Sequence, residues 1–366
     1  MTGPEMNIEV AKQNLSQVRV EPAQDRPLEE GQVRLRVKAF ALSSNNITYA
    51  VFGDMLSYWE FFPVSKSDAG DWGRIPVWGF GEVVESRSAD AVVGELFYGY
   101  FPMSSELIIL PGRADERGIT DISPHRTALA SAYSRYTRCV ADPIYRSDRE
   151  QQHMLLYPLF FTAFLIDDFL LDQAEFGSEQ MVISSASSKT AIGVAYLARE
   201  RGVKVCGLTS AANLEFTKGL DVYEQVYSYE QIDQIANRPS VYVDIAGNQD
   251  VLLAVHTHLS GLLEHSMTVG GTHWDHSADS AGQQVPAPAP QFFFAPTQIA
   301  KRTKDWGSER LDASVSSAWD NYVEWSTSWV EYQDVQGADA VTAAYLQLLA
   351  GGVDPRTGFI CSLPTS

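Results

Sequence analysis

The chain has few of the features that mark a disulfide-rich, membrane-spanning or secreted protein. Only three cysteines occur among 366 residues, and they lie far apart at Cys139, Cys206 and Cys361. Three dispersed cysteines form neither a disulfide framework nor a zinc cluster, and this usage fits a reducing, cytoplasmic compartment. No apolar run reaches the ~18 residues of a membrane span. The first residues also lack the basic and apolar regions of a secretory signal. We therefore expect no membrane partner.

Basic residues are scarce as well. The chain has 27 Lys and Arg against 46 Asp and Glu, a formal net charge of −19 at pH 7. This charge repels a phosphate backbone, so nucleic acid is excluded as an expected partner, although a local basic site for one cofactor phosphate remains compatible. The length predicts two domains, and the 45% hydrophobic content is enough to bury a sizeable core.

The clearest pattern is a strand, a turn of small residues and a helix. Met181–Ile183 is a short apolar run, hydroxyl residues lead from it to Lys189, and Ala191–Ala198 has helical spacing. Such a turn leaves N–H groups at a helix N-terminus, where an anionic phosphate is stabilised. Val203–Leu208 and Val241–Gly247 repeat the apolar run. This succession of strand, small-residue turn and helix predicts a nucleotide-binding βαβ core.

The flanking segments have the character of β structure. Short apolar or alternating runs separated by Gly and Pro indicate a small barrel or sandwich. The expected strands are Gln32–Lys38, Gly79–Val84, Val93–Gly99, Leu107–Leu110 and Gly358–Leu363. A further helix is expected over Val341–Ala350, where Gly351 and Gly352 would end it.

The order of these elements resembles the medium-chain dehydrogenase/reductase superfamily, in its zinc-free quinone and enoyl reductase branch. The segments that carry the resemblance, with the family pattern each one is similar to, are Ser43–Tyr49 (N-x-x-D loop), Gly81–Val84 (G-x-V), Val93–Gly99 (V-G-D-R-V-x-G), Pro158–Ala163 (P-L-T-A-x-T-A) and the closing stretch from Val341 to Ile360. The resemblance implies an α/β chain. Residues 1–150 and 315–366 would form a GroES-like β-barrel domain, and residues 151–314 a Rossmann domain with a doubly wound parallel sheet. Family members often dimerise through Rossmann strand edges, so a homodimer is compatible.

No catalytic zinc is expected. Family members with zinc carry a Cys in the first loop and a G-H-E, whereas Asn45 and Asn46 stand in that loop and no G-H-E precedes Gly81. Five of the seven histidines lie in residues 256–276, but no nearby Cys or acid completes a ligand set. We interpret them as solvated or hydrogen-bonded histidines.

The phosphate turn departs from the family pattern. The fingerprint G-x-G-x-x-G would fall on residues 188–193, and only Gly193 is kept. Ser and Thr are small enough for a pyrophosphate to approach and can donate to it. The expected phosphate contacts are Ser187, Ser188, Lys189, Thr190 and Gly193. A P-loop is disfavoured because Ile183 and Ser188 occupy its glycine positions, and a Ser-Lys hydrolase would need a serine where Ala186 stands. A Rossmann turn that has lost its ligand remains an alternative.

The cofactor is predicted to be NADP(H). An acid after the second strand would favour NAD, and none follows Leu208. The neutral side chains at this strand end are Thr209, Ser210 and Asn213. Tyr229 resembles the tyrosine of the family's N-Y-K segment near the adenosine phosphate. Lys218, Lys301 and Arg302 are further basic candidates, each with a solvated charge as its alternative.

Catalysis is assigned through the resemblance. Hydride would come from the nicotinamide and a proton from a hydroxyl or water. Tyr49 is the expected donor, with Asn46 and Thr48 positioning or polarising the substrate. Gly270 and Gly271 would allow close approach to the nicotinamide, and His273 would be a second donor. The aromatic residues that would line an apolar pocket, or else form simple core, are Phe52, Tyr58, Trp59, Phe61 and Phe62.

The sequence thus favours a zinc-independent NADPH-dependent reductase of an α,β-unsaturated carbonyl, a quinone or an acyl thioester. The alternative is a catalytically silent Rossmann-fold protein that binds or senses a nucleotide.

Overall fold

The computed structural model describes residues 6–23, 26–65, 67–68, 70–269 and 285–363. The chain forms two compact units, Met1–Pro158 with Val330–Ser366 (unit 1) and Leu159–Trp329 (unit 2). The first division lies beside Pro158, a proline inside the long helix α2 (Glu150–Asp172). The sequence-based division placed the boundaries at 150/151, the start of α2, and at 314/315, inside α7 (Ser308–Ser326).

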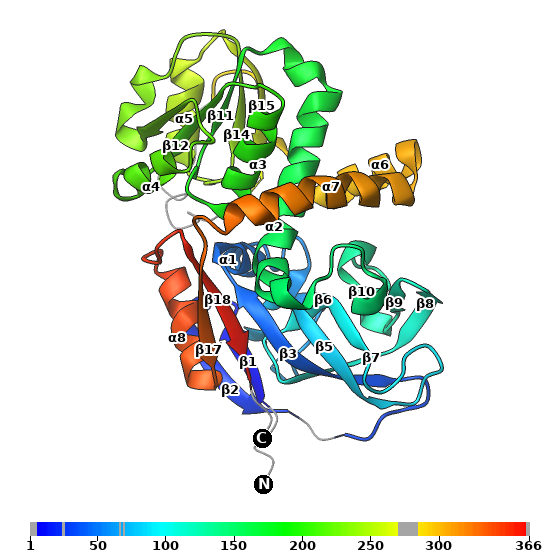
Figure 1. The fold of residues 1–366 in the computed structure, drawn as a ribbon. Helices are drawn as coiled ribbons and strands as arrows, with labels where there is room; N and C mark the ends of the chain where they lie inside the picture. The colour runs from blue at the N-terminus through cyan, green and yellow to red at the C-terminus, as the bar shows by residue number, and fades with distance from the viewer. Residues whose placement is uncertain (1–5, 24–25, 66, 69, 270–284, 364–366) are drawn as a thin grey trace. The chain divides into compact units, whose positions relative to one another are not determined.

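Unit 1 is built on mainly antiparallel β structure, in which only the β17–β18 pair among the described strands is parallel (Figure 1). Its larger sheet has nine strands in the order β17-β18-β3-β5-β6-β10-β9-β8, with β7 paired to β3, and a smaller sheet has the order β2-β1-β4. The strands are β1 (Met6–Ala11), β2 (Asn14–Pro22), β3 (Val33–Leu42), β4 (Trp72–Gly73), β5 (Pro76–Ser86), β6 (Leu96–Pro102), β7 (Glu106–Ile109), β8 (Pro111–Asp115), β9 (Gly118–Asp121), β10 (Arg135–Arg138), β17 (Glu331–Gln336) and β18 (Thr357–Ser362). The C-terminal strand β18 pairs with β3, so the tail of the chain completes this sheet. The C-terminal segment therefore completes the β structure of unit 1.

The first strand of the sequence pattern shows why this unit folds as it does. In β3, Val33, Leu35 and Val37 are buried. Arg36 and Lys38 are exposed, so buried and exposed residues alternate from Leu35 to Lys38. A period of two places one row of side chains in the core and the other in solvent. Helix α8 (Ala338–Leu349) contributes to the same core.

Residues 44–51 form a helix, although the resemblance predicts a loop over Ser43–Tyr49. Ser43 caps α1 (Ser44–Val51), and the Asn46 side chain accepts a hydrogen bond from the Ser43 N–H at 2.8 Å. This reciprocal cap satisfies donors that a helix otherwise leaves open. The S-x-x-N spacing of Ser43 and Asn46 therefore marks the N-terminus of a helix.

Unit 2 contains a parallel sheet of six strands in the order β13-β12-β11-β14-β15-β16. Numbered within the unit, this order is 3-2-1-4-5-6, the doubly wound Rossmann arrangement that the sequence predicted. The strands are β11 (Gln180–Ile183), β12 (Val205–Thr209), β13 (Gln225–Ser228), β14 (Ser240–Asp244), β15 (Leu263–Thr268) and β16 (Gln291–Phe292). Every residue of β11, β12 and β14 is buried, as expected for strands covered on both faces.

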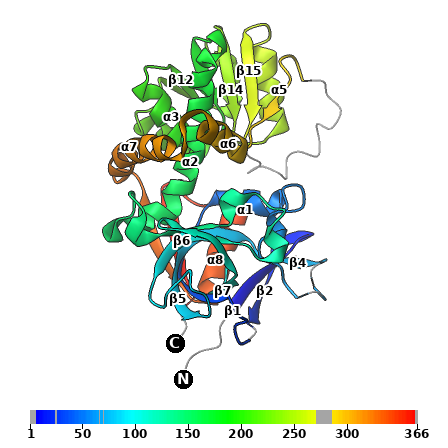
Figure 2. The same cartoon turned by 90° about the vertical axis from the view of Figure 1, so that its right-hand side faces the viewer.

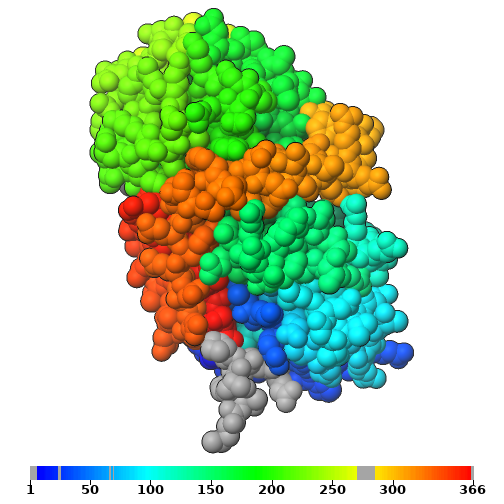
Figure 3. All heavy atoms as spheres, viewed as in Figure 1, coloured from blue at the N-terminus to red at the C-terminus, as the bar shows by residue number. Residues whose placement is uncertain are grey.

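Helices cover the two faces of this sheet. Figure 2 shows α3 (Lys189–Glu200) on one face and α5 (Gln249–His258) on the other. Other helices of the unit are α4 (Leu214–Gly219), α6 (Ala295–Trp306) and α7. In the space-filling view of Figure 3, the face of unit 2 that is drawn consists mainly of the green chain around α3 and of orange α7. Helix α3 packs closely on α2, since a Cβ on Gly193 would lie only 2.8 Å from the Cβ of Ala163. The absence of a side chain at Gly193 therefore allows α3 to pack closely on α2.

Helix α2 is long and apolar enough to satisfy the composition test for a membrane span, the only such helix among the described residues. However, 61% of its most apolar window is buried inside the protein. The buried core helix of a globular protein satisfies the same composition test, so the apolar composition of α2 is accounted for by its burial.

Candidate functional site

The turn after β11 is held to the end of β14 by a buried hydrogen-bond cluster. The hydroxyl of Ser184 donates to Oδ1 of Asp244 at 2.6 Å. The same Ser184 Oγ accepts from the N–H groups of Ile245 and Ala246 at 2.9 and 3.0 Å. Because β11 and β14 are adjacent parallel strands, this serine ties together the two backbone turns at their carboxyl ends. Ligands of open α/β sheets bind at this edge.

Asp244 is the acceptor at the centre of the cluster. Its Oδ1 also receives hydrogen bonds from the Tyr242 hydroxyl at 3.3 Å and the Gly247 N–H at 3.1 Å. Asp244 is only 1% exposed, and its burial raises the pKa of its carboxyl despite these donors. Neither Asp244 nor Ser184 was among the expected site residues, although Ser184 directly follows the predicted strand Met181–Ile183 and Asp244 lies within the predicted run Val241–Gly247.

The phosphate turn leads directly into helix α3. Ser188 is its N-cap, and Ser188 Oγ accepts from the Ala191 N–H at 3.3 Å. The remaining N–H groups of the first turn of a helix have no intrahelical partner and favour a bound anion. Lys189 and Thr190 are the first two residues of α3, so the structure places both at this helix N-terminus.

Tyr229 reaches the same turn from the end of β13. Its hydroxyl accepts a hydrogen bond from the Ser185 N–H at 3.1 Å, and Ser185 has a left-handed backbone with φ of 51°. Burial raises the pKa of Tyr229 to about 12, so the phenol keeps its proton near neutral pH. The structure therefore brings Tyr229 beside the predicted phosphate turn, across 44 residues of sequence.

A second polar cluster joins the turn to the end of β12. Ser187 Oγ accepts from the Thr209 hydroxyl at 3.2 Å and from the Asn213 side-chain amide at 3.1 Å. Ser210 is the next residue after β12 and is partly exposed. Neutral hydrogen-bonding groups thus occupy the strand end where the family's NAD-specific acid would stand.

The remaining basic candidates are engaged in ion pairs within unit 2. Lys218 is exposed and lies 3.1 Å from Glu215, one helical turn away. Arg302 is buried and its Nε contacts Oδ2 of Asp168 at 2.6 Å, which pins α6 to α2. Lys301 pairs with two carboxylates, those of Asp172 and Asp305. The structure gives Lys301 and Arg302 a structural role in place of the suggested contact with a 2′-phosphate.

The described histidines of the 256–276 segment are hydrogen-bonded or stacked. His256 contacts the Pro286 carbonyl and the Ser266 hydroxyl at 2.8 and 2.9 Å, and His258 contacts the Ile235 carbonyl at 2.8 Å. The His265 ring is stacked on Phe176 with centroids 4.0 Å apart. Within the described ranges, no group of three His, Cys, Asp or Glu side chains could hold a metal ion. Gly270, Gly271 and His273 lie outside the described residues.

Tyr49, the expected proton donor, lies on α1 in unit 1. Its hydroxyl accepts a hydrogen bond from the Trp78 indole N–H at 3.1 Å. The side chain is buried, and this burial raises the pKa of Tyr49 well above its ordinary value. Thr48 is partly exposed on the same helix.

Asn46 is fully used in holding the backbone. Its Oδ1 accepts from the Ser43 N–H at 2.8 Å, and its Nδ2 donates to the Pro76 carbonyl at 2.9 Å. Asn46 is 4% exposed. Both ends of its amide therefore position α1 against the start of β5.

The aromatic residues after α1 divide between two cores. Tyr58, Phe61 and Phe62 form one cluster with Tyr49 and Tyr100, and the partly buried Phe52 packs against it. The Tyr49 and Tyr58 rings lie 4.7 Å apart, and the Tyr49 and Tyr100 rings meet edge to face at 5.5 Å. Trp59 belongs to the main barrel core instead, where it packs on Gly53 and Gly73.

The antiparallel unit completed by the C-terminal strand and the 3-2-1-4-5-6 parallel sheet together define the medium-chain dehydrogenase/reductase fold, as the sequence predicted. The chain belongs to the family described as "Protein of unknown function (DUF2855)", whose model matches residues 40–354.

Several solved structures share this fold over nearly the whole chain. CurA from Vibrio vulnificus in complex with NADPH is 13% identical, with a TM-score of 0.66 over 99% of this chain and 100% of that chain. A mutant enoyl thioester reductase from Candida tropicalis is 12% identical, with a TM-score of 0.57 and the same coverage. The quinone oxidoreductase from Coxiella burnetii is 14% identical, with a TM-score of 0.52 over 99% and 100% of the two chains. No curated protein matches the chain. At these identities the similarity shows the fold alone.

Proposed function

We propose that this protein is a zinc-independent, NADPH-dependent reductase. The observation that carries the proposal is the acid-free, hydroxyl-lined turn between β11 and α3, with Lys189 at the helix N-terminus and Thr209 and Asn213 beside Ser187. Backbone N–H groups at a helix N-terminus suit a pyrophosphate, and neutral donors at the second strand end accept a 2′-phosphate. The NADPH in the CurA complex supports the choice of cofactor.

The hydrogen bonds of the turn fit an incoming phosphate. Ser187 Oγ already accepts from both Thr209 and Asn213, so its own O–H proton must point to a different acceptor. Tyr229 likewise accepts from the Ser185 N–H and keeps its proton to donate. Two hydroxyl donors are thus prepared for phosphate oxygens, while Lys189 would add one charge. Gly193 is required for close helix packing, a role independent of any direct ligand contact.

Tyr49 is the proposed proton donor of the reduction. Bound NADPH would supply a hydride, and one proton must then reach the reduced substrate. Trp78 donates to the Tyr49 oxygen, so the phenolic proton is directed elsewhere. Tyr49 is protonated at neutral pH, as a general acid must be, and the hydride transfer has to supply most of the driving force because burial raises the pKa of Tyr49. We assign Asn46 to positioning α1, and Thr48 to positioning substrate.

The proposed substrate is an α,β-unsaturated carbonyl, a quinone or an acyl thioester. The aromatic cluster around Tyr49 offers flat apolar surfaces, and proteins with this fold include an enoyl thioester reductase and a quinone oxidoreductase. Zinc independence rests on the Asn45-Asn46 pair in place of a ligating Cys. A homodimer and a cytoplasmic location remain predictions of the sequence.

A silent nucleotide-binding protein is the second candidate. It is favoured by one specific feature, the loss of two of the three fingerprint glycines, whose places are taken by Ser188 and Thr190. A side chain at either position narrows the approach to the backbone.

Titration of the protein with NADPH and with NADH, followed by the fluorescence of its eight tryptophans, tests both candidates. We expect NADPH to bind several-fold more tightly than NADH, and NADPH oxidation to be observed with a quinone or enone. Equal affinity for the two cofactors would contradict the assignment to NADPH. Binding of NADPH without turnover of any of the three substrate classes would favour the silent protein, and so would the absence of binding of both cofactors.

A further inference from the structure

The proposed proton donor, Tyr49, is held by an indole from another element of unit 1. The Nε1–H of Trp78, on β5, donates to the Tyr49 hydroxyl oxygen at 3.1 Å, across 29 residues of sequence. An indole nitrogen can only donate, so the Tyr49 oxygen must be the acceptor of this bond. The phenolic proton therefore points away from Trp78.

The Trp78 ring is itself fixed by its neighbours. Its backbone lies within β5, opposite Ala41 of β3 on one side and Tyr100 of β6 on the other. The indole is stacked on Tyr98, with centroids 5.6 Å apart and planes 21° apart, and it lies 5.1 Å from the Tyr100 ring. Aromatic pairs in these arrangements are favourable. The indole N–H is consequently aimed at Tyr49 by the packing of the sheet.

The burial of Tyr49 opposes its use as an acid. Its side chain is 6% exposed, and burial raises its pKa because the phenolate would lose its hydration. A general acid acquires negative charge in the transition state as its proton leaves. A buried phenol therefore needs a protein donor in place of water to stabilise that charge.

Trp78 supplies such a donor. Its hydrogen bond lowers the pKa of Tyr49, against the larger effect of burial, and weaker effects in the same direction come from Asn45 and Tyr100. A hydrogen bond to a charged acceptor is roughly twice as strong as one between neutral groups, so this bond strengthens as the proton leaves. A donor that is already aimed at the atom where charge develops needs no reorganisation.

Basic side chains are missing from the segments that build most of this aromatic cluster. Residues 44–62, 76–80 and 98–101 contain no Lys or Arg. No cation within the described residues contributes to the pKa of Tyr49 either. The neutral indole N–H therefore takes the place that a positive charge would otherwise have beside the phenol.

We propose that Trp78 is a positioning residue of the reductase, which orients the Tyr49 phenol and stabilises the phenolate that forms as the proton leaves. The inference rests on the proposed function, in which NADPH is the reductant and Tyr49 the proton donor. Once a hydride has been added to the substrate, the O–H bond of Tyr49 breaks and its proton joins the substrate anion. The electron pair of that bond stays on the Tyr49 oxygen, beside the Trp78 N–H, until solvent returns a proton.

Proton–nitrogen NMR of the indole groups in the full-length protein tests the hydrogen bond without any cofactor. The chain has eight tryptophans, and the Trp78 signal is the one that Trp78→Phe lacks. We expect this signal to shift upfield in Tyr49→Phe, which keeps the ring and removes the accepting oxygen. Tyr58→Phe, in the neighbouring ring of the same cluster, should leave it in place. A Trp78 signal that does not respond to Tyr49→Phe would overturn the proposal.

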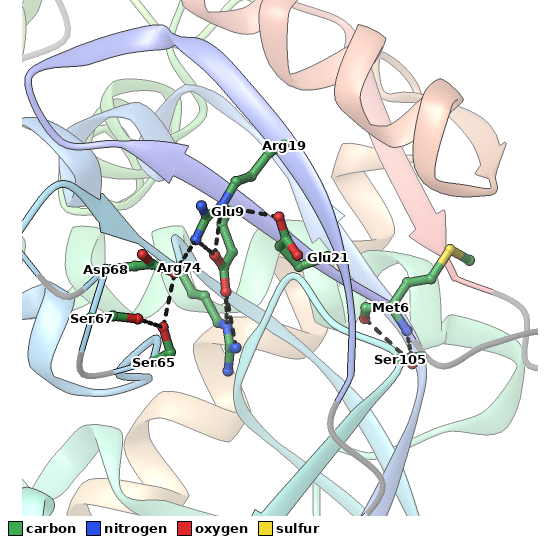
Figure 4. A network of polar contacts seen from close by, with 9 residues as sticks. All are labelled: Met6, Glu9, Arg19, Glu21, Ser65, Ser67, Asp68, Arg74 and Ser105. Carbon is green, nitrogen blue, oxygen red and sulfur yellow. Dashed lines mark hydrogen bonds and ion pairs between the residues drawn. The ribbon is translucent and has the colours of Figure 1, made fainter.

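Turnover tests the consequence for the reaction. Trp78→Phe should lower kcat about tenfold and leave NADPH affinity and the KM of a quinone or enone nearly unchanged, because the acid is misplaced and not removed. Trp72→Phe is the matched control and should behave like the parent. The Trp72 indole lies 4.3 Å from Cζ of Arg19, a member of the ion-pair network around Glu9 in Figure 4, and is not part of the Tyr49 cluster.

A double variant separates positioning from a structural role. Tyr49→Phe has no phenol to position, so adding Trp78→Phe should change its residual turnover by less than about twofold. A further tenfold fall would show that Trp78 acts independently of Tyr49 and would overturn the proposal. If Trp78→Phe does not fold by circular dichroism, Tyr49→Phe alone still decides, because one of the eight indole signals must move.

Failure of this inference is distinguishable from failure of the proposed function. If the parent reduces a substrate and Trp78→Phe does so equally well, the reductase stands and only the role of Trp78 is wrong. If the parent reduces none of the three substrate classes, the proposed function fails and the role of Trp78 fails with it, whatever the NMR signal shows.

Discussion

Ser184 donates its hydroxyl proton to Asp244 at 2.6 Å, joining the carboxyl ends of two adjacent parallel strands. The serine oxygen is also the acceptor for two backbone N–H groups of the turn after β14. One side chain thus fixes the turn after β11, the predicted phosphate turn, against the turn after β14.

The first prediction concerns this serine. Ser184→Ala removes a donor to a buried carboxylate and leaves the N–H groups of Ile245 and Ala246 without their acceptor, so the free energy of unfolding should fall by roughly 1–3 kcal/mol. Urea unfolding followed by circular dichroism measures this change. Ser317→Ala, at an exposed serine of α7, should stay within about 0.5 kcal/mol of the parent. A Ser184→Ala variant as stable as the parent would mean that water replaces the hydroxyl at no cost.

The second prediction concerns the charge at the N-terminus of α3. Lys189→Ala should weaken NADPH binding by about five- to 150-fold, the loss of one charge-assisted contact worth roughly 1–3 kcal/mol. Lys218→Ala is the control, because Lys218 is exposed and pairs with Glu215 on its own helix. Fluorescence titration of the three proteins makes the comparison. Parent-like affinity in Lys189→Ala would show that the turn has been misread.

The sequence predicted the fold well wherever the signal is local. Strand β3 follows from the alternation of Val33, Leu35 and Val37, and β11 from its short apolar run. Helix α1 was missed because residues 43–49 were compared with a loop motif, although the Ser43 and Asn46 capping pair was visible in the sequence.

Contacts between distant residues were harder to predict. The Ser184–Asp244 bond spans 60 residues and the Trp78–Tyr49 bond 29. The first could have been inferred, since Ser184 directly follows β11, Asp244 ends β14, and a Rossmann sheet places these two strands side by side. The second depends on how two side chains of the barrel pack, and no pattern in the sequence specifies this.

The third prediction concerns the proton donor. Tyr49→Phe should leave NADPH affinity nearly unchanged and lower turnover by about 10²-fold or more, because the phenolic proton is lost while the ring is kept. Tyr58→Phe is the matched control, since its ring lies 4.7 Å from that of Tyr49 in the same cluster. Steady-state kinetics with a quinone or enone compares them. If Tyr58→Phe abolishes turnover and Tyr49→Phe does not, the donor has been assigned to the wrong tyrosine.

The fourth prediction concerns metal. Purified protein should contain no stoichiometric zinc, and a chelator should leave turnover unchanged, because Asn45 and Asn46 stand where a zinc-binding member carries its first-loop Cys. Elemental analysis of the purified protein measures this directly. One tightly held zinc per chain would contradict zinc independence and direct attention to the histidines of residues 256–276.

The last prediction concerns a buried histidine of unit 1 and the pH dependence of stability. His153 lies among aromatic rings, 4.1 Å from the Tyr98 centroid and 5.5 Å from that of Phe80, and burial lowers its pKa to about 3. The unfolded chain binds a proton at His153 near its ordinary pKa, whereas the folded protein does so only in much stronger acid. The contribution of neutral His153 to the free energy of unfolding is therefore fully present above the ordinary pKa of histidine. This contribution is lost progressively as the pH falls toward 3.

Lowering the pH from 7 to 5 should cost about 2 kcal/mol of unfolding free energy through His153 alone. The carboxylate of Asp142, 3.9 Å from Nε2, would offset part of this cost once the ring is protonated. His153→Phe keeps an aromatic ring in the aromatic site and cannot be protonated, so its stability should fall less over the same interval. Urea unfolding of both proteins at pH 7 and pH 5 gives the difference. Identical losses in the parent and in His153→Phe would show that His153 does not control the acid sensitivity of the fold.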